Sequence, residues 1–72
     1  MNCYMISYFS EYGPEDHGFW DIDDEKAKEF FNKFIEAREK ERPRTSGTLH
    51  RLDPATPDSP ARMVLVDHIG GE

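Results

Sequence analysis

The sequence of 72 residues contains a single cysteine, Cys3. An internal disulfide is therefore excluded, and so are the zinc sites that need two or more cysteines at short spacing. The three histidines, His17, His50 and His68, are scattered along the chain and show no metal-ligand spacing. We therefore expect the protein to bind neither a metal ion nor another cofactor.

Long apolar runs are also missing. No stretch approaches the ~20 apolar residues that a membrane-spanning helix needs, and the first residues show no basic region followed by an apolar segment, as a signal peptide would. A lone cysteine is typical of proteins in reducing compartments. These features predict a cytoplasmic protein without a membrane segment.

Basic residues are absent from the first third of the chain. Residues 1–25 carry seven acidic residues and no Lys or Arg, residues 26–52 carry eight basic and four acidic residues, and residues 53–72 carry one basic and four acidic residues. The formal net charge is −6. Charge blocks of this kind create surface potentials that steer charged partners.

Residues 24–41 carry the longest periodic pattern in the chain. Apolar side chains recur there at i, i+3, i+4 and i+7 from Ala27 onward, which is the spacing of one face of an α-helix. Asp23 is a suitable N-cap, since its carboxylate can accept from amides of the first turn. Pro43 disfavours a helical conformation at Arg42. The pattern predicts one amphipathic helix over about residues 24–41.

Strand-forming residues lie on both sides of this helix. Alternating apolar residues predict long strands at residues 2–10 and 61–69 and a short strand at residues 48–52. Residues 19–22 are expected to form either a short strand or an extended lead-in to the helix. Glycine and proline predict loops at residues 11–18 and 53–60. Residues 70–72 are expected to form a frayed tail.

This order of elements predicts the fold class and the layers. We expect a single small α+β domain, in which an antiparallel or mixed sheet of three to four strands packs on one helix. The strands at residues 2–10 and 61–69 are expected to lie side by side at the centre of the sheet. A single helix covers one face of the sheet, so exposed Tyr and Met residues on the other face suggest a homodimer.

The acidic segment before the helix also contains the aromatic residues Tyr12, Phe19 and Trp20. Phe19 and Trp20 are expected to belong either to the core or to an exposed aromatic patch. Aromatic side chains are concentrated in the hot spots of protein interfaces, and an acidic field favours a basic partner. We expect a non-enzymatic protein-binding module. An inhibitor that blocks a nucleic-acid-binding surface, as a phage anti-CRISPR or other anti-defence protein would, fits this pattern. The candidate protein-binding residues are Glu11, Tyr12, Glu15, Asp16, Phe19, Trp20 and Asp21.

A second cluster of charge follows the helix and suggests an alternative function. Arginine forks bind phosphate oxygens, and hydroxyl and backbone donors can add to such a contact. Glutamates at positions 36, 39 and 41 interrupt this basic corner, and the overall acidity weakens binding to a polyanion. The candidate phosphate or nucleic-acid contacts are Arg38, Lys40, Arg42, Arg44 and Arg51.

Catalysis is not expected, although an enzyme centred on His17 or His68 is a third alternative. Each histidine follows an aspartate, and a carboxylate-oriented histidine is a common general base. Adjacent residues of a strand point to opposite faces, however, so neither dipeptide is a ready dyad. No nucleophile elbow or phosphate-binding glycine loop is present either.

The end of the chain suggests a fourth alternative. The order of elements resembles the ubiquitin-like β-grasp, and Gly70-Gly71 followed by Glu72 resembles a precursor that awaits removal of its last residue. This resemblance implies a ubiquitin-like modifier. Such tails usually follow basic residues that help an activating enzyme to bind, whereas residues 67–69 are Asp-His-Ile.

Overall fold

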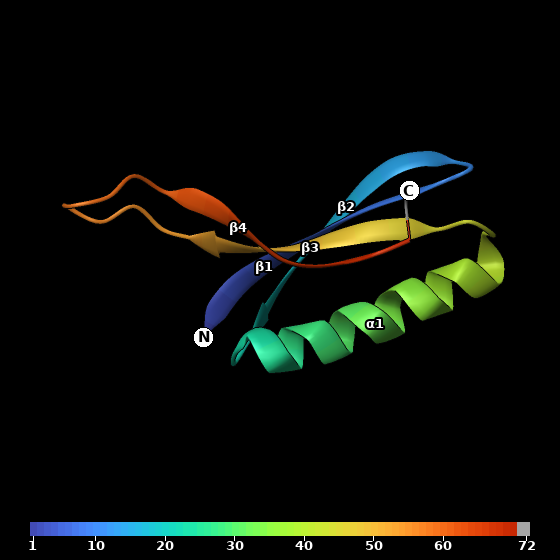
Figure 1. Cartoon of the computed structure of the whole chain (residues 1–72), viewed down its shortest axis with the longest axis horizontal. Helices are drawn as coiled ribbons and strands as arrows, with labels where there is room; N and C mark the ends of the chain where they lie inside the picture. The colour runs from blue at the N-terminus through green and yellow to red at the C-terminus, as the bar shows by residue number, and fades with distance from the viewer. Residues whose placement is uncertain (71–72) are drawn as a thin grey trace.

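The computed structural model describes residues 1–70 and contains one four-stranded sheet and one helix (Figure 1). The elements are β1 (Asn2–Ser10), β2 (Gly13–Asp21), α1 (Asp24–Glu41), β3 (Ser46–Asp53) and β4 (Arg62–Ile69). All strand pairs are antiparallel. The predicted α+β fold and its order of elements are confirmed. Of the expected frayed tail, residues 71 and 72 lie outside the described residues.

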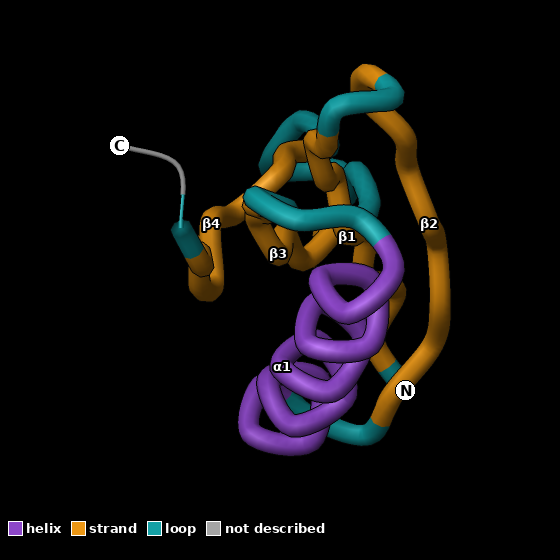
Figure 2. The backbone as a smooth tube through the Cα atoms, turned by 90° about the vertical axis from the view of Figure 1, so that its right-hand side faces the viewer, coloured by secondary structure: helices purple, strands orange, loops and turns teal. Residues whose placement is uncertain are grey.

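The helix α1 has the predicted boundaries, because both of its ends are set by local chemistry. The Asp23 side chain accepts a hydrogen bond from the Lys26 backbone amide at 2.9 Å. At the other end, Arg42 has extended backbone angles and Pro43 follows it. The helix lies along one face of the sheet (Figure 2).

The expected loop at residues 11–18 is wrong, because most of these residues belong to β2. A turn at residues 11–12 connects β1 to β2, and Gly13 follows it with a φ of +101° that favours glycine. Pro14 lacks an N–H for strand pairing, but β2 is an edge strand, where proline is tolerated. The glycines and proline that suggested a loop are therefore compatible with an edge strand.

The expected pairing of the first and last strands is also wrong. The strand order is β2-β1-β3-β4, so β1 and β3 are central and β4 is the second edge. Residues 54–61 bring β4 back beside β3, and a small bridge between Thr56 and Ser59 continues this hairpin. Strands that follow one another in sequence usually pair. In Figure 1 the β3–β4 hairpin extends beyond the N-terminal start of α1.

The core lies between α1 and the sheet and is small. Seven hydrophobic residues of the described chain are buried: Tyr4, Ile6, Tyr8, Ala27, Phe31, Ile35 and Leu49. Tyr4 and Tyr8 alternate with the other residues of β1 and therefore face the helix with Ile6. The expectation that tyrosines lie on the far face of the sheet is thus wrong for both, whereas methionines do lie there.

Candidate functional site

All seven candidate protein-binding residues lie on one edge of the sheet. Glu11 and Tyr12 form the turn between β1 and β2, and the other five belong to β2. We call residues 11–23 the acidic edge, because they include five acidic residues and no Lys or Arg. The outer side of β2 pairs with no other strand of the described chain.

The alternation of β2 divides the candidate residues between two faces of the sheet. Glu15 and Phe19 are opposite Tyr8 and Tyr4 and so face the helix. The Phe19 ring is half-buried and lies 5.5 Å from the ring of Tyr4. Phe19 is therefore part of the packing against the core. Trp20 points to the other face, where it is 66% exposed.

At the turn, one arginine contacts two of the candidate residues. Arg42 Nη1 lies 2.6 Å from Glu15 Oε2, and the guanidinium carbon lies 4.7 Å from the centre of the Tyr12 ring. The remaining carboxylates of the acidic edge, Glu11, Asp16, Asp21 and Asp23, form no ion pair within residues 1–70. Most of the negative charge on this edge is thus uncompensated.

The basic corner is not brought together as the sequence suggested. Arg38 pairs with Glu41 at 3.8 Å, and Arg42 pairs with Glu15. Arg51 lies on β3 beside the start of α1. The other four candidate residues lie at, or just after, the C-terminal end of α1. In the described part of the chain, only Lys40 and Arg44 of the five candidates have no carboxylate partner.

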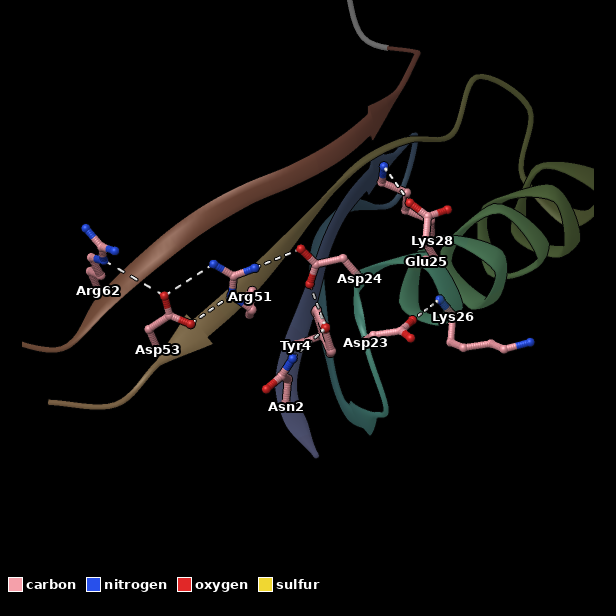
Figure 3. Close-up of polar contacts among 10 residues, drawn as sticks. All are labelled: Asn2, Tyr4, Asp23, Asp24, Glu25, Lys26, Lys28, Arg51, Asp53 and Arg62. Carbon is pink, nitrogen blue, oxygen red and sulfur yellow. Dashed lines mark hydrogen bonds and ion pairs between the residues drawn. The ribbon is translucent and has the colours of Figure 1, made fainter. Parts of the chain in front are cut away.

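Arg51 instead belongs to a group that we call the polar clamp: Tyr4, Asp24, Arg51 and Asp53 (Figure 3). The Tyr4 hydroxyl donates to Asp24 Oδ1 at 2.7 Å, and Arg51 Nη1 donates to Asp24 Oδ2 at 2.7 Å. Arg51 Nε also donates to Asp53 Oδ1 at 2.8 Å. The clamp ties the first turn of α1 to β1 and β3.

The clamp shifts the titration of its members. The hydrogen bond from Tyr4 lowers the pKa of Asp24, and contact with Arg51 lowers it further. The pKa of Asp53 is lowered by its hydrogen bond to Arg51, and burial raises the pKa of Tyr4. The carboxylates are held ionised by partners within the chain, which fits a structural role. Sequence reasoning missed the clamp because its members are far apart in the chain.

The face of the sheet opposite the helix, which we call the open face, is covered by no element of the described chain. The strand register arranges its side chains in rows across β2, β1, β3 and β4. The rows are Trp20-Cys3-Leu52-Met63, Gly18-Met5-His50-Leu65 and Asp16-Ser7-Thr48-His68. The first two rows are mainly apolar, and the third is polar.

Large apolar side chains on the open face are well exposed. Besides Trp20, Leu65 is 58% exposed and Met63 is 50% exposed. A groove of about 590 Å³ lies beside Trp20 and Leu52, and a second of about 360 Å³ lies beside Asp16 and His68. Apolar residues occupy both faces of β4, which is typical of a central strand, although β4 is an edge strand. This pattern also fits an edge strand whose open side is a binding surface.

Neither histidine dipeptide forms a catalytic arrangement in the described residues. The His17 ring packs 5.0 Å from the Phe34 ring, and Asp16 lies on the opposite face of the sheet. The Asp67 carboxylate accepts from the backbone amide of His68 at 2.8 Å. Residues 1–70 contain no group of three or more His, Cys, Asp or Glu placed to hold a metal ion. They also contain no helix that is long and apolar enough to cross a membrane.

Comparison with known proteins adds no further information, since no protein-family model, curated protein sequence or solved structure matches this chain.

Proposed function

We propose that the protein is a non-enzymatic protein-binding module whose acidic edge contacts a basic surface on a partner protein. The observation that carries this proposal is that Glu11, Asp16, Asp21 and Asp23, in β2 and its flanking residues, form no ion pair within residues 1–70, where the outer side of β2 also pairs with no strand. Charge of one sign on an exposed edge raises the rate at which an oppositely charged partner associates.

Aromatic side chains at the edge supply the short-range part of the contact. Tyr12 is 71% exposed, and the arginine stacked on it is held in place by Glu15. Trp20 lies at the border between the acidic edge and the open face. Tyrosine and tryptophan contribute large, rigid contact areas and are enriched among the residues that dominate binding energies.

A basic protein surface commonly serves to bind nucleic acid, so occupying it inhibits that binding. This is the activity expected of a phage anti-CRISPR or other anti-defence protein. Direct nucleic-acid binding through the basic corner has less support, because Arg38, Arg42 and Arg51 already have carboxylate partners. The ubiquitin-like alternative depends on a tail whose last two residues lie outside the described chain.

The proposal is tested with the partner that co-purifies with a tagged copy from its native cell. The double variant Glu11→Lys/Asp21→Lys changes the charge of the acidic edge without touching the core or the helix cap. At low salt we expect its association rate with the purified partner to fall roughly tenfold, and the salt dependence of that rate to weaken.

The matched control is Glu36→Lys/Glu39→Lys, which makes the same charge change on the exposed side of α1. Its association rate should fall much less. Equal effects of the two double variants would show that only net charge matters, and an unchanged rate for Glu11→Lys/Asp21→Lys would remove the acidic edge from the mechanism. In a competition assay, the wild-type protein should also displace nucleic acid from the partner.

A further inference from the structure

The open face is unusual for the surface of a chain in which 33% of the residues are charged. Its first two rows contain no Asp, Glu, Lys or Arg, and they expose Trp20, Met63 and Leu65. His50 lies between Met5 and Leu65 in the second row, and its Nδ1 is buried without a hydrogen-bond partner among residues 1–70. Contiguous exposed apolar surface of this kind marks an interaction site.

The area of the open face is sufficient for a specific interface. Four strands spaced about 4.8 Å apart, each about eight residues long at about 3.3 Å per residue, give a flat footprint of about 500 Å². Two such flat footprints together bury about 1,000 Å². The side chains that protrude from the sheet add further area to this value. This area reaches the lower limit for a specific protein interface.

We propose that the open face binds a second copy of this chain, with the two sheets packed face to face about a twofold axis parallel to the strands. Such an axis places β2 of one copy over β4 of the other, and β1 over β3. Aligned sheets pack about 10 Å apart with their strands inclined by about 30°. A core of seven buried residues is small, and self-association is a common way to stabilise such a domain.

The register of the rows supports this orientation, because it pairs complementary side chains. Asp16 and His68 stand at opposite ends of the same row, so Asp16 of each copy faces His68 of the other. In the first row, Trp20 faces Met63 of the second copy, and sulfur–aromatic contacts are favourable. Both pairs occur twice in the dimer.

The alternative axis, perpendicular to the strands, is disfavoured by charge. It would place β2 over β2, and the acidic edges of two molecules with a net charge of −6 would lie together. The parallel axis keeps the two acidic edges apart and leaves Glu11 and Asp21 at the rim. In this dimer Asp16 and Trp20 lie in the interface between the two copies, whereas Glu11, Tyr12 and Asp21 remain available to a partner. The dimer does not depend on the proposed function.

Sedimentation velocity of the full chain, from micromolar to millimolar concentration, tests the dimer directly. We expect a reversible monomer–dimer equilibrium. Leu65→Glu should raise the dimer dissociation constant roughly 100-fold, because each copy contributes one buried charge in place of an apolar contact. The control is Ile22→Glu, since Ile22 is 65% exposed but lies outside the open face. Circular dichroism confirms that both variants fold.

A charge exchange tests the orientation. Asp16→Lys and His68→Glu should each raise the dissociation constant roughly three- to tenfold, since each rim contact occurs twice. The double variant should restore dimerisation, because the new lysine faces the new glutamate of the other copy. Within one molecule the two positions lie on opposite edge strands and cannot pair. A monomer at all concentrations would overturn the dimer, and a double variant without restoration would overturn the parallel axis.

Discussion

Replacing Tyr4 by Phe removes one oxygen atom from the polar clamp and leaves the packing of the ring unchanged. The Tyr4 side chain is buried, and its hydroxyl donates to Asp24 and accepts from Asn2 Nδ2 at 3.2 Å. A hydrogen bond to a charged group contributes about 1.5–3 kcal/mol to stability. Asp24 is 37% exposed, so water replaces part of this contact. We expect Tyr4→Phe to lower the free energy of unfolding by about 1–1.5 kcal/mol at neutral pH.

The loss should depend on pH with a defined sign. Because the pKa of Asp24 is lowered in the folded protein, its stabilising contribution is present above about pH 4 and is lost as the pH falls through its folded pKa. The hydrogen bond from Tyr4 is the largest cause of this lowering. Without it, the pKa of Asp24 moves back towards its ordinary value. The difference between wild type and Tyr4→Phe should therefore be largest at neutral pH and shrink in acid.

Urea unfolding at neutral pH and at about pH 3 measures both quantities. The matched control is Tyr8→Phe, because Tyr8 is buried on the same face of β1 but forms no side-chain hydrogen bond within residues 1–70. It should change the free energy of unfolding by less than about 0.5 kcal/mol at either pH. A difference for Tyr4→Phe that is equal at both pH values would refute the electrostatic origin of the effect.

Two further substitutions test the packing and the cap of α1. Phe31→Ala removes a fully buried ring from the small core and should lower the free energy of unfolding by about 3–5 kcal/mol. Ile22→Ala, at a site that is 65% exposed and lies outside the open face, should cost far less in the same thermal melts. Asp23→Ala removes the acceptor of the Lys26 amide and should cost about 1 kcal/mol, with Asp58→Ala in the exposed β3–β4 connection as the control. A cost below about 0.3 kcal/mol for Asp23→Ala would show that the cap contributes little.

The position and length of the helix could be predicted because its signals are local. The carboxylate of Asp23 reaches an amide three residues away, and Pro43 acts on its immediate neighbour. The extent of β2 could not be predicted in this way. Pro14 and Gly18 are typical of loops, and only the position of β2 at the sheet edge makes them acceptable in a strand.

The candidate site was predictable in part for the same reason. The acidic edge is contiguous in sequence, so its charge could be recognised before its structure was known. Whether Phe19 or Trp20 is exposed depends on the register with β1, which places Phe19 beside Tyr4 and Trp20 beside Cys3. The open face draws side chains from four strands, and its composition follows only from the strand order.

The central position of β1 has a consequence for the order in which the molecule can assemble. Ile6 pairs with His17 across a short hairpin, but its other neighbour is Leu49, which enters the chain only after the helix and the turn beyond it. Contacts between residues far apart in sequence slow folding, because a long loop must close before they form. During synthesis β1, β2 and α1 are complete before β3 exists. The buried face of the helix therefore lacks Leu49 until the chain has been extended through residue 49 of 72.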